Sequence, residues 1–594
     1  MMHIRTKSVI TAALMGAVLA SCGGNAGTET AKGDLNQRFD TYKENFVTNL
    51  WKVYPGWASS QGYHKYDSVL VVPDAAGRQR ELDFAKANLD SLKQYEPGKL
   101  SDNNRTDYLM IENQLKATIW SANEQKSYEW NPSEYNVSGS FAEMLNGNYD
   151  SLDTRLHHIG LRLAAVPAFY EAAKQNIKNP TTEHTLLAIE QNLGGISVFE
   201  TDLQAALKQS HLPDAEKQQI TEKAKAAVAA IKGYTEWLKQ LKNDQPRSFR
   251  LGKELYAKKF DYEIQSGYTV DQVYDKAMAH KKDLHQKMLV LANELWSKYM
   301  GTAPKPTDSL QLIRQVVDKI SLQHAKPDSF QAAIEKQIPV LVEFIKKKDL
   351  IYIDPAKPLV VRREPDYMAG VAGASISAPG PYDKNGNTYY NVGSLNGWPK
   401  DKAESYLREY NNYTLQILNI HEAIPGHYTQ LVYSNQSPSI IKAILGNGAM
   451  IEGWAVYTEK MMLENGYGSE DGSGNPSPEM MLMYYKWNLR STCNTILDYS
   501  VHVKDMTKEQ AMQLLVNEAF QQQAEAEGKW KRVSVTQVQL CSYFTGYTEI
   551  YDLREDLKKK LGDRFNLKAF HEKFLSYGSA PVKYIRELME KEFK

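Results

Sequence analysis

The sequence predicts a mainly α-helical protein, a large multi-helix body that includes one small β-hairpin or sheet. Apolar residues recur at helical spacing from Asp34 to about Lys348 and again from Lys400 to the end of the chain. Between Leu350 and Gly397 the pattern changes to short β-type runs. The clearest helical run keeps one apolar face through steps of three, four or seven residues, at Val270, Val273, Ala277, Leu284, Met288, Leu291 and Leu295.

Composition and charge argue against several classes of protein. The 594 residues include 71 Lys+Arg and 71 Asp+Glu, so the formal net charge is zero. This balance argues against nucleic acid as a partner, because phosphate binding depends on clustered Lys and Arg. A multi-span membrane protein is excluded because no apolar stretch reaches about 18 residues. Hydrophobic residues at 42% and charged residues at 24% are typical of a folded chain.

The N-terminus has the pattern of a secretory signal. Residues 1–21 begin with a basic segment, and the apolar segment Val9–Ala20 that follows is too short to span a bilayer. The end of this signal, Leu19–Cys22, resembles the bacterial lipobox, where signal removal leaves a lipidated cysteine as the new first residue. Cys22 is therefore the expected lipidation site. The alternative is an ordinary signal peptide followed by an incidental cysteine.

This resemblance implies a protein of the bacterial cell envelope, attached to the membrane through acyl chains at Cys22. Gly23 is not the aspartate that usually retains lipoproteins in the inner membrane, so the outer membrane is favoured. Residues 22–33 are small and polar and predict a flexible tether. After the tether we expect an N-terminal helical region, 34–348, and a catalytic-type region, 349–594, in one compact body.

A β-hairpin is expected directly before the most informative motif. The extended runs Met368–Ser377 and Thr388–Val392 flank the loop Pro379–Asn387, which is rich in Pro, Gly and Asn. Two further β-type runs, Ile351–Ile353 and Leu359–Val361, precede them.

The segment Asn419–Gln430 carries the residues that point to chemistry. It places His421 and Glu422 together, with His427 six residues after the first histidine. The familiar zinc-peptidase signature has two histidines four residues apart on one helical face. A spacing of six is different, because on a regular helix it leaves the two side chains about 120° apart.

Pro425 and Gly426 provide the means to bring the two histidines together. Proline removes a backbone donor and glycine tolerates unusual backbone angles, so a bulge or kink is expected between His421 and His427. A widened turn would return His427 to the face of His421. The second His-Glu pair of the chain, His571-Glu572, has no histidine after it and is interpreted as structural.

Glu452 is the expected third ligand, on the apolar helix that follows. Glu452 and Glu459 are seven residues apart and share a face, but Glu452 lies beside Gly453 among apolar residues, where an unpaired carboxylate would be costly. The alternative for Glu452 is a cap or salt bridge within a helix bundle. Two histidines and one glutamate with an open fourth position form the ligand set of catalytic zinc, so one Zn²⁺ ion is expected.

These motifs resemble the bacterial family called domain of unknown function 885, whose members look like distant relatives of helical, glutamate-liganded zinc peptidases. The likeness is most specific between Arg363 and Pro581. It implies a zinc-peptidase-like cleft. The family commonly has Pro-Gly before the position of Gln539, whereas this chain has Gln537-Val538. The matching segments are His421–Gln430, Glu452–Glu459, Arg363–Gly370, Asp498–His502, Gln539–Gly546 and Phe570-His571, with Gly578 and Pro581.

By resemblance to zinc peptidases, the hairpin would be the edge that binds substrate. Ala372, Gly373 and Ala374 would pair with a peptide by β-augmentation, with Tyr390 and Asn391 nearby. The alternative is an ordinary structural hairpin.

Three further residues have candidate roles. Tyr543 would stabilise the developing oxyanion, with a core tyrosine as the alternative. His502, oriented by Asp498 one helical turn earlier, would assist in stabilising the oxyanion, but a structural histidine is the favoured interpretation. Arg554 would hold a peptide carboxylate, unless it forms an ordinary ion pair.

The leading hypothesis is a zinc-dependent peptidase in which His421, His427 and Glu452 hold the metal and Glu422 is the general base. Two alternatives remain open, a non-catalytic lipidated protein that binds peptides or glycans, and a zinc amidase acting on cell-wall material. Endo- or exopeptidase action, oligomeric state and pairing of Cys493 with Cys541 are not determined by the sequence.

Overall fold

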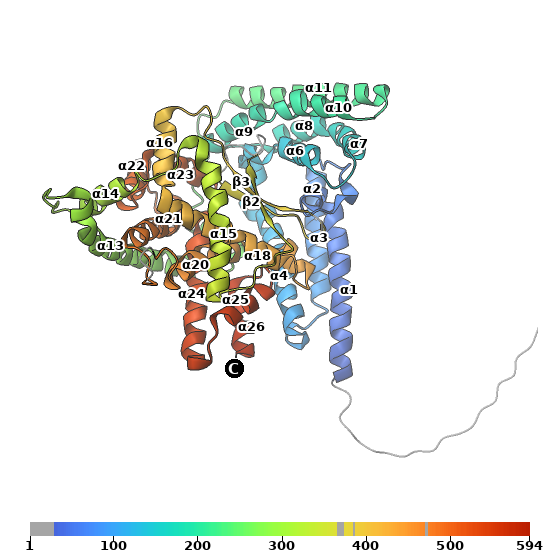
Figure 1. Cartoon of the computed structure of the whole chain (residues 1–594). Coiled ribbons are helices and arrows are strands. Elements are labelled where there is room, and N and C mark those ends of the chain that lie inside the picture. Colours follow the sequence, from blue (N-terminus) through green and yellow to red (C-terminus); the bar gives the residue numbers. More distant parts are fainter. Residues whose placement is uncertain (1–28, 365–373, 384–385, 470–472, 594) are drawn as a thin grey trace, which may run out of the picture.

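The computed structural model describes residues 29–364, 374–383, 386–469 and 473–593, and helices dominate it (Figure 1). The mainly helical prediction is confirmed. The first helix begins at Glu29, so the end of the expected tether, 22–33, already belongs to a helix. Cys22 lies outside the described residues.

The first group of helices contains three long ones, α1, α3 and α4, which run side by side in Figure 1. Its members are α1 (Glu29–Val53), α2 (Pro55–Ser60), η1 (His64–Tyr66), α3 (Ala75–Leu92), η2 (Pro97–Lys99), α4 (Asp102–Trp120), η3 (Ser121–Gln125), α5 (Ser127–Trp130) and η4 (Pro132–Glu134).

The second group surrounds a hydrophobic core of its own, which includes Tyr170, Phe199 and Tyr234. It lies at the top of Figure 1. This separate core within the N-terminal region was not expected from the sequence. The members are α6 (Ser138–Asn146), α7 (Leu152–Leu163), α8 (Val166–Asn176), α9 (Thr182–Gly194), η5 (Val198–Asp202), α10 (Leu203–Gln209) and α11 (Asp214–Gln240).

The main core draws on both predicted regions, since it contains Phe39, Trp296 and Met589 alike. The helices that complete it are α12 (Lys253–Glu263), α13 (Val270–Met300), α14 (Ser309–Ile320), η6 (Pro327–Ser329), α15 (Phe330–Lys348), α16 (Lys400–Glu409), α17 (Asn412–Glu422), α18 (His427–Ser434), α19 (Ile440–Ile444), α20 (Gly448–Glu464), α21 (Pro478–Val503), α22 (Lys508–Met512), η8 (Gln513–Glu518), α23 (Gln523–Val535), η9 (Gln539–Cys541), α24 (Ser542–Leu561), η10 (Gly562–Arg564), α25 (Leu567–Ser576) and α26 (Val582–Glu592).

Helix α13 illustrates how the local sequence specifies an element. Thr269 caps its first turn through a capping box with Gln272, which satisfies free backbone donors. The expected apolar face is buried, except that Leu291 is only half-buried. The helix packs along α21 with this face.

Three short strands form one sheet in the order β1-β3-β2. Strands β2 (Ala374–Ser377) and β3 (Thr388–Val392) are antiparallel, so the expected hairpin is confirmed from Ala374 onward, whereas residues 368–373 of its first arm lie outside the described residues. Strand β1 (Leu359–Arg363) pairs with β3 in parallel. The other β-type run, Ile351–Ile353, is not a strand, and no sheet partner is described for it.

Helices α20 and α24 cross at a contact between two glycines. A Cβ atom on Gly453 would lie 2.3 Å from the carbonyl carbon of Gly546, and one on Gly546 would lie 1.7 Å from the carbonyl oxygen of Ala449. Only residues without a side chain allow the backbones to approach this closely. The contact sets the distance between the two helices.

Two smaller observations complete the fold. Cys493 and Cys541 are both buried and free. Within the described ranges no helix is both long and apolar enough to cross a membrane.

His571 is a structural residue, as expected. It is fully buried, its Nε2 accepts a hydrogen bond from the Tyr457 hydroxyl at 2.7 Å, and its Nδ1 donates to the Leu350 carbonyl oxygen at 2.8 Å. Burial lowers its pKa from 6.5 to about 4. The folded state therefore holds this imidazole in the neutral form.

Acidification is expected to destabilise the fold through His571. The unfolded chain binds a proton near pH 6.5, whereas the folded chain does so near pH 4, so the free energy of unfolding falls as the pH falls between these values. Full loss amounts to about 3 kcal/mol at 1.36 kcal/mol per pKa unit. Urea denaturation at pH 7, 5.5 and 4.5 measures the slope. The variant His571→Gln should show a shallower slope than the native chain, and equal slopes would contradict the assignment.

Candidate metal centre

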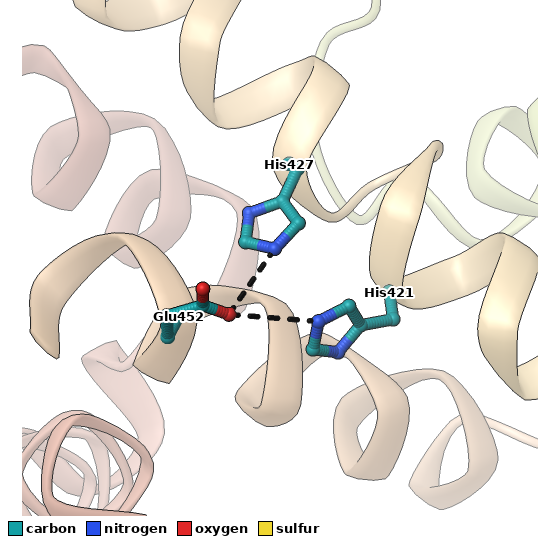
Figure 2. A group of neighbouring side chains, drawn as sticks. All are labelled: His421, His427 and Glu452. Atoms are coloured by element: carbon teal, nitrogen blue, oxygen red, sulfur yellow. Dashed lines mark ion pairs between the residues drawn. The ribbon is translucent and has the colours of Figure 1, made fainter. Parts of the chain in front are cut away.

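Three helices each contribute one side chain to a compact cluster of possible metal ligands (Figure 2). His421 lies in the last turn of α17, His427 is the first residue of α18, and Glu452 lies in the second turn of α20. One ligand atom from each residue lies within 4.8 Å of the others. The sequence prediction that these three residues converge is confirmed.

The backbone between the two histidines breaks the helix completely. The amide of Gly426 donates to the carbonyl oxygen of Ile420 at 3.0 Å, a connection six residues long, and the Ile424-Pro425 peptide is cis. The sequence predicted a bulge or kink within one helix, whereas the structure has two separate helices. The physical reason is the tight reversal at Gly426, where a Cβ atom would lie 1.8 Å from the carbonyl oxygen of His421.

The two imidazoles approach the same carboxylate oxygen. The Nε2 atoms of His427 and His421 lie 3.4 Å and 3.8 Å from Oε2 of Glu452. The rings stand perpendicular, with centroids 4.8 Å apart, so both Nε2 atoms face one point (Figure 2). The ligand side chains are 8% (His421), 13% (His427) and 21% (Glu452) exposed, so the cluster is sheltered but reachable.

Glu459 orients His421 from the opposite side of the ring. Nδ1 of His421 donates to Oε1 of Glu459 at 2.7 Å, and the indole of Trp487 donates to the same oxygen at 2.9 Å. This contact fixes the proton on Nδ1 and leaves Nε2 free to bind a cation. The seven-residue spacing placed Glu459 on the face of Glu452, but its contact with His421 and the role of Trp487 were missed. No local sequence pattern predicts that Trp487, on α21, lies beside Glu459, on α20.

The charges around the cluster favour a cation. Burial alone would lower the pKa of His421, but contact with Glu452 and Glu459 outweighs burial and raises it. Burial opposes ionisation of Glu452 as well, yet the contacts with His421 and His427 hold its pKa well below the usual range. The imidazoles therefore lie in a negative environment, which attracts a proton or a metal ion.

Glu422 and Tyr543 lie beside this cluster. Burial raises the pKa of Glu422, although the neighbouring His427 and His421 oppose the effect. Burial also raises the pKa of Tyr543, and the charge of Glu452 adds to it. The Tyr543 hydroxyl accepts a hydrogen bond from Arg532 at 3.4 Å. Both groups thus lie within electrostatic reach of the ligands.

The turn before Tyr543 keeps a backbone conformation that favours glycine at the position where this chain has Val538. Val538 has a φ of 71°, in the left-handed region that favours glycine. Asp498 holds this turn, because its carboxylate accepts hydrogen bonds from the amides of Val538 at 2.9 Å and Leu540 at 3.3 Å. Asp498 also accepts from Tyr256 at 2.6 Å. Asp498 therefore holds this loop. Nδ1 of His502 is buried without a hydrogen-bond partner in the described chain, so the expectation that Asp498 orients His502 is not met.

His502 and Arg554 have the contacts of structural residues. Nε2 of His502 contacts the carbonyl oxygens of Val533 at 3.0 Å and Thr536 at 3.1 Å, and the side chain is buried. Arg554 is buried between Glu464 and Glu555, with nitrogen–oxygen distances of 2.7 Å to each. Because these partners engage both side chains, we assign neither a role in catalysis or in carboxylate binding.

Two of the predicted substrate-binding residues of the hairpin also have the contacts of structural residues. Tyr390 is fully buried and donates to Asn419 at 2.8 Å, which fastens the sheet to α17. Asn391 is buried and links the strands, accepting from Arg362 at 2.7 Å and donating to Ser377 at 2.7 Å. Both therefore support the sheet from within, instead of facing a substrate. Ala374 is half-buried at the start of β2, whereas Ala372 and Gly373 lie outside the described residues.

The fold and the cluster define a class of protein: a large, mainly helical chain in which three helices supply a His–His–Glu group of metal-ligand type. The model of a family of bacterial proteins of unknown function, DUF885, matches residues 55–589. The chain belongs to this family, as its motifs predicted.

Two solved structures are similar to the chain. One is described as a "putative lipoprotein of unknown function" from Shewanella oneidensis, with 54% identity and a TM-score of 0.84, covering 93% of this chain and 99% of that chain. The other is a "putative lipoprotein" from Colwellia psychrerythraea, with 16% identity and a TM-score of 0.74, covering 95% and 99%, and it shows the fold alone. Among curated proteins, none matches.

We expect the cluster to bind zinc, and we expect the variant Gly426→Ala to lose this binding. Its Cβ atom would overlap the carbonyl oxygen of His421, so the break must open and His427 must move. The matched control is Gly448→Ala, whose Cβ atom would find its nearest neighbour at 3.8 Å. Zinc content after dialysis, measured beside circular dichroism, checks this. Full zinc content in a folded Gly426→Ala protein would show that the break does not position His427.

The variant Glu459→Gln is expected to weaken zinc binding by about 10- to 100-fold, the usual effect of losing the partner of a histidine ligand. The amide keeps the size of the carboxylate but loses its charge next to His421. Competition with a fluorescent zinc chelator measures the affinity. Glu464→Gln on the same helix is the control and should bind zinc as the native chain does. Native affinity in both variants would contradict the role of Glu459.

Proposed function

We propose that the chain is a zinc-dependent peptidase that hydrolyses peptide bonds in the cell envelope. The observation that carries the proposal is the convergence of two imidazoles and one carboxylate, from three helices, on one sheltered point beside a further carboxyl group. Such a set with an open fourth position is the ligand arrangement of catalytic zinc.

The distances within the cluster support the fit of a zinc ion. A tetrahedral ion with bonds of about 2.0–2.1 Å separates its ligand atoms by about 3.3 Å. The nitrogen–oxygen distances of 3.4 Å and 3.8 Å are close to that value. The second nitrogen of His421 is engaged by Glu459, which is the usual arrangement for a histidine that binds metal.

Glu422 is the proposed general base. When bound, zinc polarises the scissile carbonyl group and lowers the pKa of its water to about 7. The Glu422 carboxylate takes a proton from the attacking water and passes it to the leaving nitrogen. Because burial raises its pKa, this carboxyl group holds a proton more readily than an exposed glutamate, which suits it to both transfers.

Tyr543 is the proposed donor to the developing oxyanion. Its raised pKa keeps the hydroxyl protonated, so the hydroxyl donates a hydrogen bond to negative charge. Arg532, which donates to the same oxygen, makes the hydroxyl a stronger donor.

Strand β2 is the proposed edge for the substrate in a zinc-peptidase-like cleft. It is an outer strand of the described sheet, so its free side offers backbone groups to a peptide. The sheet is fastened to α17, the helix of His421, by the Tyr390–Asn419 hydrogen bond. A peptide paired with Ala374 would therefore run past the metal centre.

The proposed location is the bacterial cell envelope, where a lipid anchor at Cys22 attaches the chain to a membrane. The lipobox-like segment that ends at Cys22 supports this location, as does the description of the Shewanella oneidensis structure as a "putative lipoprotein". An outer-membrane anchor is favoured by Gly23.

The proposal is tested with the mature chain loaded with zinc. Glu422→Gln should retain zinc and lose hydrolysis of a peptide library by about 100-fold or more, because the general base is removed. His427→Ala should lose the zinc itself. Mass spectrometry of the digest, with metal analysis, measures both. The control is Glu572→Gln, at the structural His-Glu pair, which should behave as the native chain.

Two results would contradict the proposal. Native-rate cleavage by zinc-loaded Glu422→Gln would remove the assigned base, and cleavage that survives chelation would remove the metal. The same digest performed on purified peptidoglycan distinguishes cell-wall amides from ordinary peptide bonds.

A further inference from the structure

A guanidinium group lies directly beside the proposed oxyanion donor. Arg532, in the last turn of α23, donates from Nη2 to the hydroxyl oxygen of Tyr543 at 3.4 Å and to Oε1 of Gln539 at 2.6 Å. Burial raises the pKa of Tyr543 and the charge of Glu452 raises it further, so this hydroxyl lies within electrostatic reach of a metal-ligand carboxylate. Arg532 and Tyr543 are both half-buried, so part of each side chain is open to solvent.

Arg532 has no negatively charged partner of its own. Its two acceptors, the Gln539 amide and the Tyr543 hydroxyl, are neutral, and within the described ranges no carboxyl group forms an ion pair with it. Both hydrogen bonds leave from Nη2, so the donors on Nε and Nη1 have no partner in that part of the chain. A guanidinium with unused donors is suited to a carboxylate, which it binds through paired hydrogen bonds.

The neighbouring carboxyl groups are engaged by other cations. Glu525, also on α23, is ion-paired with Arg490 at 2.8 Å and lies 3.9 Å from Nζ of Lys529. Burial opposes ionisation of Glu525, but the charges of Arg490 and Lys529 lower its pKa to about 2. Glu409 is ion-paired with Lys486 at 2.7 Å. Neither carboxylate is therefore left for a further guanidinium.

Positive charge gathers around Lys529, one turn before Arg532. Lys529 is buried, and its Nζ donates to Oδ1 of Asn494 at 2.7 Å, a neutral oxygen. Burial lowers the pKa of Lys529 well below its ordinary value, and the charges of Arg490 and Arg532 lower it further. The opposing charge of Glu525 does not cancel this effect. This side of the site therefore favours an anion.

Arg490 is the other guanidinium near the metal centre, and it is already occupied. It is ion-paired with Glu525, and its guanidinium lies over the ring of Trp487, 4.9 Å from the centroid. Trp487 in turn donates to Glu459, the partner of His421. Arg490 therefore supports the metal centre from behind, and Arg532 is the candidate for contact with a substrate.

The spacing of Tyr543 and Arg532 matches the end of a peptide chain. The C-terminal carboxylate lies one residue beyond the last scissile carbonyl group, and one residue spans at most about 3.6 Å. The Tyr543 hydroxyl oxygen and Nη2 of Arg532 are 3.4 Å apart. A peptide whose last scissile carbonyl oxygen is bound by Tyr543 therefore brings its carboxylate within reach of Arg532. A chain that continued beyond this residue would offer only a neutral amide there.

We propose that Arg532 binds the C-terminal carboxylate of the peptide substrate and that the enzyme releases the last amino acid, as a carboxypeptidase does. Water adds its hydroxyl group to the carbonyl carbon of the penultimate residue, the C–N bond breaks, and the leaving nitrogen takes the remaining proton. The products are a shortened peptide and a free amino acid. The proposal rests on the proposed function, and it decides between exopeptidase and endopeptidase action.

Peptide binding tests the proposal apart from hydrolysis. The probe is a pentapeptide of alanine with an N-terminal fluorophore and a free C-terminal acid, and its twin carries a C-terminal amide. The mature chain with Glu422→Gln, loaded with zinc, keeps both probes intact. Fluorescence anisotropy should show the acid binding at least about tenfold more tightly than the amide, because only the acid offers the guanidinium a charged partner. Equal affinities overturn the proposal.

In this background, Arg532→Gln should remove the preference for the acid and leave the affinity for the amide unchanged. Arg532→Lys keeps the charge without the planar pair of donors and should show an intermediate preference. The matched control is Lys531→Gln, which removes an exposed cation from the same helix, ion-paired with Glu190 at 2.6 Å, and should keep the preference. A folded Arg532 variant with the native preference overturns the assignment.

A third probe distinguishes a terminal carboxylate from a side-chain carboxylate. It is the amidated peptide with glutamate as its last residue, and it should bind no more tightly than the alanine amide. Tighter binding that depends on Arg532 would mean that the guanidinium recognises acidic side chains, which overturns the carboxypeptidase assignment.

The products of the native, zinc-loaded chain give the second readout. Mass spectrometry should show the acid losing one C-terminal residue at a time, with the amide cleaved at least about tenfold more slowly. Loss of the Tyr543 contact in Arg532→Gln would slow both peptides alike, so the ratio of their kcat/KM values isolates the carboxylate contact. Internal cleavage of acid and amide at equal rates overturns the proposal.

The two proposals fail separately. An Arg532-dependent preference for the acid, with no hydrolysis by the native chain, overturns the proposed function and leaves the carboxylate site standing. Chelator-sensitive hydrolysis that uses acid and amide equally overturns the carboxypeptidase assignment and leaves the peptidase standing.

Discussion

The break between α17 and α18 is the constraint on which the candidate site depends. It closes because Gly426 lies against the carbonyl oxygen of His421, and the indole of Trp454 donates to the carbonyl oxygen of Pro425 at 2.9 Å. Trp454 lies two residues after Glu452 on α20. The helix that carries Glu452 therefore also holds the backbone between His421 and His427 in place.

Helix α20 organises its surroundings by presenting a different residue to each neighbour. Glu452 and Glu459 face the histidines, Gly453 lies against α24, and Tyr457 donates to His571. The glycine contact matters for chemistry as well as packing, because it brings the helix of Tyr543 close to Glu452. A helix with several buried partners cannot rotate, since any rotation would break all of these contacts together.

The buried ionisable side chains of the candidate site are paired with one another. Buried charges are costly unless they are paired, and the cluster pairs two imidazoles with Glu452 and Glu459 while Glu422 lies nearby. The surplus of carboxyl groups suits a divalent cation.

The helical class, the hairpin and the convergence of His421, His427 and Glu452 were predictable from the sequence, because helical periodicity, strand patterns and the Pro425-Gly426 break are local features of the chain. Two outcomes were not predictable: that Glu459 supports His421, and that buried contacts engage Tyr390, His502 and Arg554. These outcomes depend on which faces of distant helices meet. Local periodicity indicates that one face of a helix is apolar, but only the packing of the whole chain selects the helix or strand that this face contacts.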